Sequence, residues 1–210
     1  MRTVQEAVSR GSLTRNAICE AALLIIDTDG LPAVSMRGLA SALGVKAGSL
    51  YHHFRSKEEL LAECAELLYQ ETGPLPSGGN WKDQVCAIFV QLADLVEMHP
   101  QAAPLLIGNL ARSRSARERA RAIAVAVGAS GLSPEGRASL LSNLAALLAG
   151  HSVLSVWASG SVDAPRLKGP DAGQAFPAVG TQVRLMGQEF EAGMAALIDG
   201  FVRGESGEGF

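Results

Sequence analysis

Apolar residues recur at intervals of three and four positions along almost the whole chain, which is the spacing of one face of an α-helix. Nowhere do apolar and polar residues alternate convincingly between turn residues, as they do in a strand. The pattern therefore predicts an all-α protein. The expected helices begin at polar residues and end at glycines or before prolines. They cover about 15–29, 36–43, 45–54, 57–68, 81–99, 105–110, 134–159 and 182–203, and a further helix that the segment 111–122 leads into ends near residue 130.

The first part of the chain has the clearest start and stop signals. Thr14 is placed to cap the first helix, and Gly30 to end it. Gly44 supplies a left-handed residue after the second helix, and the short third helix VKAGSLYHHF, residues 45–54, follows at once. Ser56 and Glu59 have the spacing of a capping box at the start of the fourth helix.

The third helix is unusual because most of its residues are polar. If it packs through Leu50 and Phe54, which are four residues apart, then Gly48, Ser49 and His52 lie on its opposite side. A helix, a glycine turn and a short second helix form the arrangement that places a recognition helix in the major groove of DNA. A corner of two helices with polar outer residues is also common in helical proteins, so both interpretations stay open at this point.

The local charge favours DNA, although the chain as a whole has a formal net charge of −3. Between residues 35 and 57 stand four Lys or Arg and two His, with no Asp or Glu. A basic patch on an acidic protein is a better indication of a nucleic-acid partner than the total charge.

Residues 14–68 resemble the N-terminal domain of the TetR family of bacterial transcriptional regulators. The resemblance is densest in AVSMRGLASALGVKAGSLYHHFRSKEELL, residues 33–61, and covers about a quarter of the chain. It implies a homodimer that binds a palindromic operator in double-stranded DNA, expected to be a repressor, and a C-terminal helical domain that binds a small-molecule effector and releases the DNA. The implied domains are 1–57 for DNA binding, ordered from about residue 13, and 58–210 for effector binding and dimerisation.

The resemblance also implies roles for individual residues. Arg37 resembles a residue that contacts a base or phosphate near the groove edge, and Tyr51 and His53 resemble a phosphate-contacting pair. Lys57 is expected to meet a phosphate at the amino end of the fourth helix, where free N–H groups favour an anion. The other expected contacts lie along the recognition helix, at Lys46, Ala47, Gly48, Ser49 and His52. Only Arg37, Lys46, Ser49 and His52 are placed to give sequence preference, while Ala47 offers at most a contact to a thymine methyl.

The second part of the chain contains no motif that names a subclass. By resemblance to the family, the helices over 134–159 and 182–203 are expected to form the dimer interface, and their many Ala and Gly residues permit close approach. A ligand site needs apolar residues with a few polar ones. The candidates, which indicate a largely apolar effector, are Phe89, Leu105, Leu106, Asn109, Leu147, His151 and Trp157. The alternatives are that the two helices are simply core helices and that His151 is a core residue bonded to a carbonyl.

Other segments give structural expectations. GPLPSGGN, residues 73–80, is too rich in Pro and Gly for a helix and predicts a loop or hinge. Residues 160–180 predict a long loop. The helix over 134–159 is apolar nearly all round, which predicts burial on most sides. The arginine run between Arg112 and Arg121 predicts a solvated helix face, with attraction of an anion or DNA as the alternative.

The cysteine count and the hydropathy of the chain bear on disulfides, metal binding and membrane insertion. Cys19, Cys64 and Cys86 are odd in number and fit neither a disulfide framework nor a metal site, so they are expected to be buried apolar residues. We expect no metal, no cofactor and no membrane partner. We find no run of about 18 apolar residues and no cleavable leader, which leads us to expect a cytoplasmic protein.

Two alternatives to a regulator are an enzyme and an adaptor. An enzyme would use His151 with Ser152 or Ser155, or Cys86 with a histidine. We expect no catalytic residues, because the chain has no nucleophile elbow, no suitably spaced pair of acids and no phosphate-binding glycine loop. A helical sensor or adaptor of the same fold, acting through protein partners without binding DNA, is the second alternative.

Overall fold

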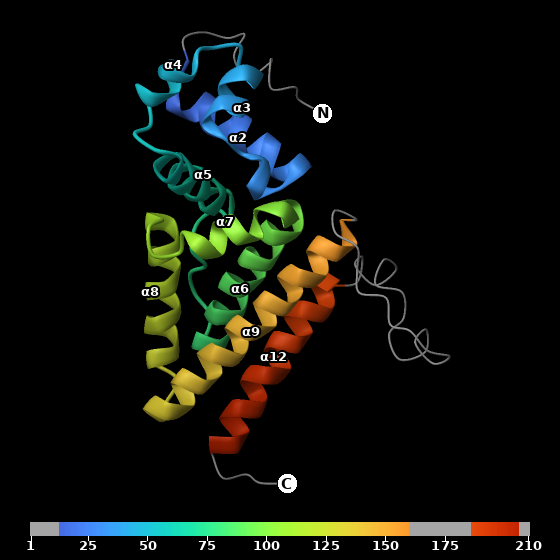
Figure 1. Cartoon of the computed structure of the whole chain (residues 1–210). Helices are drawn as coiled ribbons and strands as arrows, with labels where there is room; N and C mark the ends of the chain where they lie inside the picture. Colours follow the sequence, from blue (N-terminus) through green and yellow to red (C-terminus); the bar gives the residue numbers. More distant parts are fainter. Residues whose placement is uncertain (1–12, 160–185, 206–210) are drawn as a thin grey trace, which may run out of the picture. The chain divides into compact units, whose positions relative to one another are not determined.

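A computed structural model of the chain describes residues 13–159 and 186–205, and within these ranges every regular element is a helix (Figure 1). The α-helices are α2 (Arg15–Asp29), α3 (Met36–Ala42), α4 (Ala47–Tyr51), α5 (Lys57–Glu71), α6 (Trp81–Met98), α7 (Ala103–Gly108), α8 (Arg114–Gly128), α9 (Pro134–Ala158) and α12 (Met186–Glu205). Short 3₁₀ turns lie at Leu31–Ala33 and Pro100–Ala102. The all-α prediction is confirmed. The predicted loop over 160–180 and the expected start of order near residue 13 depend on residues outside the described ranges.

Packing divides the chain into two compact units. Unit 1 comprises Met1–Glu71 and Gln101–Arg117, and unit 2 comprises Thr72–Pro100 and Glu118–Phe210. The expected boundary between residues 57 and 58 separates the predicted DNA-binding part from the predicted effector-binding and dimerisation part. It is not a boundary between packing units, and it stays a prediction.

The first four helices of unit 1 share one apolar core. Its fully buried side chains include Ile18, Ala22, Ile26, Leu39, Leu50, Phe54, Leu60, Cys64 and Leu68. Because these side chains come from α2, α3, α4, α5 and the segment after α4, their burial fixes how the short helices lie against one another.

The turn between α3 and α4 has the predicted geometry. Gly44 has a φ of 67°, in the left-handed region. The Gly44 N–H donates to the Ser41 carbonyl at 3.1 Å, and the Val45 N–H donates to the Ala40 carbonyl at 2.9 Å. These are the two bonds of a Schellman ending, so α3 stops sharply and α4 begins three residues after the glycine.

Capping residues explain where the helices of unit 1 begin. The hydroxyl oxygens of Thr14 and Ser35 cap α2 and α3. The Ser56 hydroxyl accepts from the Glu59 N–H at 3.2 Å, as predicted. The Glu59 carboxylate, however, accepts from the Arg55 N–H at 2.8 Å, so the return bond of the predicted capping box is displaced by one residue.

Hydrogen bonds also fasten α7 and the start of α8 to α5. The Glu66 carboxylate accepts from the Ser113 and Ser115 hydroxyls at 2.7 Å each, and from the Ser115 N–H at 3.2 Å. The Tyr69 hydroxyl donates to the Leu106 carbonyl at 3.1 Å. Residues 101–117 therefore belong to unit 1 although they follow α6 in the sequence.

Unit 2 is a helical bundle in which α6, α9 and α12 pack against one another. Its core consists of Val85, Phe89, Ala93, Ala126, Val127, Leu132, Leu140, Leu144, Phe190, Met194 and Ile198. The predicted break over 73–80 is confirmed as a segment without a helix. It ends in a capping box between Asn80 and Asp83, which starts α6.

The long helix α9 is much more exposed in the single chain than its composition suggests. In its most apolar window of 18 residues, 28% is buried, so the prediction of burial on most sides is wrong for the single chain. A narrow stripe that includes Leu140 and Leu144 faces the core. The exposed positions include Ala145, Ala146, Ala149, Gly150 and Val153. By length and composition Pro134–Trp157 could cross a membrane, but one such helix is weak evidence of a membrane span, and polar residues interrupt its apolar sequence.

The arginine run departs from its prediction at one position. Arg112, Arg114, Arg117 and Arg121 are exposed. Arg119 is buried, and its guanidinium donates to the Gly73 carbonyl at 2.6 Å. Arg119 thus points back to the loop that follows α5 instead of facing solvent.

Candidate nucleic-acid interface

The helix α4 is anchored by apolar side chains and turns its polar ones outward. Leu50 on α4 and Phe54 just after it are both 0% exposed, as predicted. Gly48 and His52 are exposed, and Ser49 is half-buried. With only five residues in the helix, this outer surface is short and consists mostly of small hydrogen-bonding groups.

The nine residues predicted to contact DNA come from three neighbouring elements. Arg37 lies on α3, Lys57 is the first residue of α5, and the others lie in or beside α4. The exposed members are Arg37, Lys46, Gly48, Tyr51 and His52, and the half-buried ones are Ala47, Ser49, His53 and Lys57. All nine are therefore at least partly accessible, while their contacts with DNA stay a prediction.

Glycine at position 48 has no explanation within unit 1. A Cβ there would meet no atom within 4 Å. Glycine in a helix costs about 1 kcal/mol relative to alanine. Close approach of α4 to another molecule would account for this cost.

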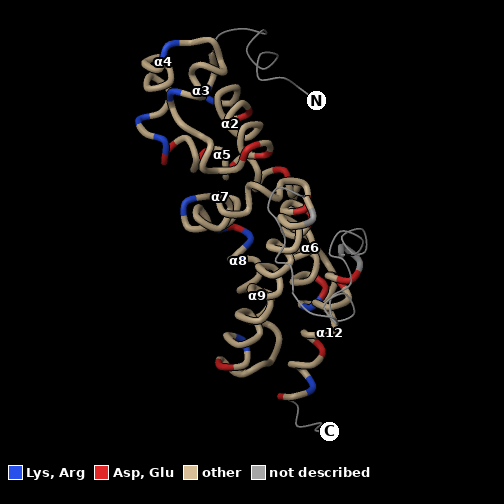
Figure 2. The backbone as a smooth tube through the Cα atoms, turned by 45° about the vertical axis from the view of Figure 1, so that its right-hand side comes forward, with Lys and Arg blue, Asp and Glu red and all other residues tan. Residues whose placement is uncertain are grey.

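Charge is distributed unevenly over this part of the chain. Figure 2 shows basic positions before and after α4, and acidic positions along α2 and α5. At the start of α5 the Glu59 N–H is already bonded to Ser56, and hydrogen bonding to Ser56 lowers the pKa of Glu58. The first turn of α5 therefore offers an anion fewer free donors than we expected, and the attraction there depends mainly on Lys57.

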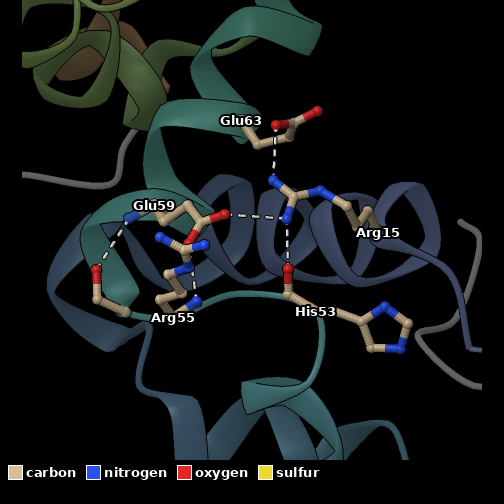
Figure 3. A network of polar contacts seen from close by, with 6 residues as sticks. Arg15, His53, Arg55, Glu59 and Glu63 are labelled. Carbon is tan, nitrogen blue, oxygen red and sulfur yellow. Dashed lines mark hydrogen bonds and ion pairs between the residues drawn. The ribbon is translucent and has the colours of Figure 1, made fainter.

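The sequence did not reveal a polar network centred on Arg15, the first residue of α2 (Figure 3). The Arg15 guanidinium donates to the His53 carbonyl, to Glu59 Oε1 at 3.0 Å and to Glu63 Oε2 at 2.9 Å. Its central carbon lies 4.0 Å from the centre of the Phe54 ring. Hydrogen bonding to Glu63 raises the pKa of Arg15, and burial opposes this shift. A cation in the first turn of a helix, where the helix dipole disfavours it, is the signal that could have pointed to acidic partners elsewhere.

The seven predicted ligand residues fall into both units. Leu105, Leu106 and Asn109 belong to unit 1, and the other four belong to unit 2. The Asn109 side chain donates to the Leu105 carbonyl at 2.9 Å, within its own turn of the chain. In unit 2, Phe89 is a core residue, and Leu147 and Trp157 are half-buried. Their role in ligand binding stays a prediction.

His151 is buried on α9 with a ring nitrogen that lies close to the Glu97 carboxylate. The residue is 5% exposed, and its ring centre lies 4.7 Å from that of Phe190. His151 Nε2 lies 3.1 Å from Glu97 Oε1, but it has no aligned hydrogen-bond partner among the described residues. Burial lowers the pKa of His151, and the charge of Glu97 opposes this shift. The Ser152 and Ser155 hydroxyls donate to backbone carbonyls of α9, so the imidazole activates neither of them.

Two hollows in unit 2, of about 700 and 710 Å³, are lined by other residues. The first lies between α9 and α12, beside Gly136 and Phe201. The second lies between the segment 74–77, α6 and α12, beside Gln91 and Cys86. Cys86 is half-buried rather than buried as expected, whereas the other two cysteines are fully buried.

Comparison with known proteins identifies the family. A family model described as "Bacterial regulatory proteins, tetR family" matches residues 18–64. An HTH-type transcriptional regulator of Saccharopolyspora erythraea is 31% identical over 161 residues, which cover 74% of this chain and 67% of the relative. The chain belongs to the TetR family. Other curated relatives of this TetR-family chain are named as transcriptional repressors.

Solved structures show the same fold over nearly the whole TetR-family chain. BioQ with its double-stranded DNA operator has a TM-score of 0.63 and 23% identity, over 91% of this chain and 99% of BioQ. ActR of Streptomyces coelicolor in complex with (S)-DNPA has a TM-score of 0.64 and 24% identity, over 92% of this chain and 99% of ActR. At these identities the likeness confirms the predicted fold, a helix-turn-helix domain followed by a helical domain.

Proposed function

We propose that this TetR-family chain represses transcription by binding a palindromic operator as a homodimer, and that a small-molecule effector releases it from DNA. The observation that carries the proposal is the accessible polar face of α4, which follows the Gly44 turn and is flanked by basic residues, with no Asp or Glu between residues 35 and 57. The curated relatives are transcriptional regulators, which favours a binding protein over an enzyme. In this proposal residues 1–57 bind DNA, residues 58–210 dimerise and bind the effector, and the protein acts in the cytoplasm.

Each recognition helix enters one major groove. The side chains that read base edges are Arg37, Lys46, Ser49 and His52, because each offers hydrogen-bonding groups and all are accessible. Ala47 contacts a thymine methyl, and Gly48 allows close approach. Tyr51, His53 and Lys57 hold phosphates, which supplies affinity and salt dependence rather than sequence preference. Two such helices of one dimer would lie about 34 Å apart, one turn of DNA.

The exposed face of α9 supports the dimer. A long apolar helix with 28% of its most apolar window buried leaves much apolar surface in water, which a monomer rarely tolerates. Small exposed residues on α9 and on α12, such as Ala149 and Gly200, permit close packing of helices. We therefore expect Ala149→Glu to give monomers in sedimentation analysis. Val125→Glu, at an exposed apolar position on α8, is the matched control and should stay dimeric.

The effector is expected to be largely apolar and to bind in unit 2 near His151. The support is a buried imidazole nitrogen that has no aligned partner among residues 13–159 and 186–205, with the Glu97 carboxylate 3.1 Å away, since a hydroxyl or carbonyl of a ligand would satisfy it. Phe89, Leu147 and Trp157 would provide the apolar surroundings. The other candidate ligand residues, Leu105, Leu106 and Asn109, lie in unit 1.

The experiment is a selection of genomic DNA fragments by the purified full chain, followed by affinity measurements on the retained fragment. We expect one palindromic fragment. An Arg37→Ala, His52→Ala double variant should lose about 10- to 100-fold in affinity and relax its sequence preference, as expected for lost base contacts. Arg121→Ala removes an exposed charge from α8 and should bind like the wild type. A reporter gene behind the fragment should be repressed by the protein.

Failure of the wild-type protein to retain any DNA at low salt would contradict the proposal, because phosphate contacts are strongest there. A tight dimer that binds no DNA but holds one specific protein would favour the adaptor instead.

A further inference from the structure

The recognition helix α4 cannot set its own position. An isolated helix of five residues is unstable in water, because few of its hydrogen bonds form after the costly first turn. Its orientation therefore depends on what holds its ends. The preceding end is fixed by the Schellman bonds around Gly44. The following end leads through His52 and His53 into the segment before α5.

Arg15 holds this following end. One guanidinium from α2 donates to the His53 carbonyl, covers the Phe54 ring at 4.0 Å and donates to Glu59 and Glu63 on α5 at 3.0 and 2.9 Å. Figure 3 shows the His53 carbonyl directed at the guanidinium while the His53 imidazole points away from it. The backbone of His53 is thus fixed without using the side chain that is proposed to meet a phosphate.

Glu59 links Arg15 to a second point of the segment between α4 and α5. Its Oε1 accepts a hydrogen bond from the Arg15 guanidinium at 3.0 Å, and its Oε2 accepts one from the Arg55 N–H at 2.8 Å. Arg15 is thereby joined to the segment between α4 and α5 at two places, His53 and Arg55. That segment lies between two proposed phosphate contacts, Tyr51 and Lys57.

Surface stabilisation alone does not account for this arrangement. The Arg15 side chain is 41% exposed, and exposed ion pairs contribute little to stability. A cation at the first position of α2 is also disfavoured by the helix dipole. The planar fork of arginine, in contrast, suits a group that must hold several partners in fixed directions and stack on a ring.

We infer that Arg15 is a positioning residue for DNA binding. By holding the His53 carbonyl, the Phe54 ring and two carboxylates of α5, it fixes the recognition helix and the segment from Tyr51 to Lys57 in the geometry that the operator requires. The inference rests on the proposed DNA-binding function, and it assigns Arg15 no contact with DNA.

The test compares Arg15→Lys, Arg15→Ala and Glu63→Gln with the wild-type full chain on the selected operator fragment. Affinity is measured over a range of salt concentrations, and thermal unfolding shows whether each variant is folded. Glu63→Gln is the most informative variant because it removes a negative charge near the DNA-binding helix. Simple electrostatics expects it to bind DNA more tightly, whereas loss of positioning makes it bind more weakly. Glu20→Gln, an exposed carboxylate on α2 that bonds Asn16 and not Arg15, is the matched control.

We expect Arg15→Lys and Glu63→Gln each to lose about tenfold in operator affinity, comparable to one charge-assisted hydrogen bond. The slope of affinity against salt should be unchanged, since no phosphate contact is removed. Glu20→Gln should bind like the wild type or more tightly. If Arg15→Ala fails to fold, the other two variants still decide the question.

Wild-type affinity in both Arg15→Lys and Glu63→Gln would overturn the inference. So would tighter binding by Glu63→Gln together with a slope reduced by about one in Arg15→Ala, because Arg15 would then contact a phosphate directly. A wild-type protein that retains no DNA at all would overturn the proposed function itself. This result can be distinguished from a failure of the Arg15 inference, because it is obtained with the wild type before any variant is compared.

Discussion

Replacing Glu66 by glutamine should destabilise the protein and should do so in a pH-dependent way. The Glu66 carboxylate accepts from the hydroxyls of Ser113 and Ser115, from the Ser115 N–H and from the Gln70 side chain at 3.2 Å. Glutamine of the same shape keeps one acceptor oxygen but loses the charge and the second acceptor. The variant therefore tests the link between α5 and the start of α8.

The magnitude follows from the pKa of Glu66. Burial raises this pKa, but the hydrogen bonds from Ser113, Ser115 and Gln70 outweigh burial and lower it from 4.5 to about 2. At about 1.4 kcal/mol per pKa unit the full difference would be about 3 kcal/mol. Because the carboxylate remains partly in contact with solvent, we expect a smaller loss in the free energy of unfolding, about 1.5 kcal/mol. For a chain of this size that loss lowers Tm by about 3 to 6 °C.

The sign of the pH dependence is fixed by the lowered pKa. As the pH falls through about 4.5, the carboxyl of the unfolded chain takes up a proton while the folded one remains ionised. The contribution of Glu66 is therefore complete above about pH 4.5 and is lost between about pH 4.5 and pH 2. The difference between wild type and Glu66→Gln should shrink over the same interval.

Urea unfolding followed by circular dichroism at pH 7, 5, 4 and 3 measures this difference. Ser115→Ala supplies a control, because Glu66→Gln should cost less in that background if the two residues interact. An equal difference between wild type and Glu66→Gln at pH 7 and pH 3, or no difference at pH 7, would refute the reasoning.

Three further predictions concern other elements. Gly44→Ala should lower the free energy of unfolding by about 1 to 2 kcal/mol, because the φ of Gly44 is 67°. Gly48→Ala should leave the free energy of unfolding unchanged or raise it by up to about 1 kcal/mol, but it should weaken operator binding. Thermal unfolding and DNA titration of the two variants measure these effects. His151→Leu should change stability at pH 7 by less than about 1 kcal/mol. As the pH falls below 6.5, the ordinary pKa of histidine, the variant should lose less stability than the wild type, because burial lowers the pKa of the folded histidine. A loss above about 2 kcal/mol in urea titrations would contradict the absence of an aligned partner for Nε2 among the described residues. Lys57→Ala should weaken binding to all DNA sequences about equally and reduce the salt slope by about one, and an unchanged slope would remove Lys57 from the phosphate contacts.

Local signals in the sequence predicted most helix boundaries. Thr14, Gly30, Gly44 and Ser56 act on backbone groups within a few residues of themselves, so their effect is readable without knowing the fold. The apolar spacing of Leu50 and Phe54 likewise placed the core face of α4 correctly.

Contacts between residues far apart in the sequence could not be predicted from such local signals. The partners of Arg15 lie 38, 44 and 48 residues after it in the sequence, and the carbonyl that accepts from Arg119 lies 46 residues before it. The local pattern does not identify the partners of these arginines, because they depend on which carboxylate or carbonyl the fold brings near.

The sequence by itself determined the helical class, the helix-turn-helix and the family, since these depend on the spacing of apolar residues, on caps and on a dense local motif. Only the tertiary structure decided that α9 keeps most of its apolar surface outside the core of the single chain. It also decided that His151 is buried without an aligned partner and that Arg15 joins α2 to the end of the recognition helix. The physical reason is that composition states how much apolar surface or charge a helix has, whereas burial and pairing depend on the neighbours that packing supplies.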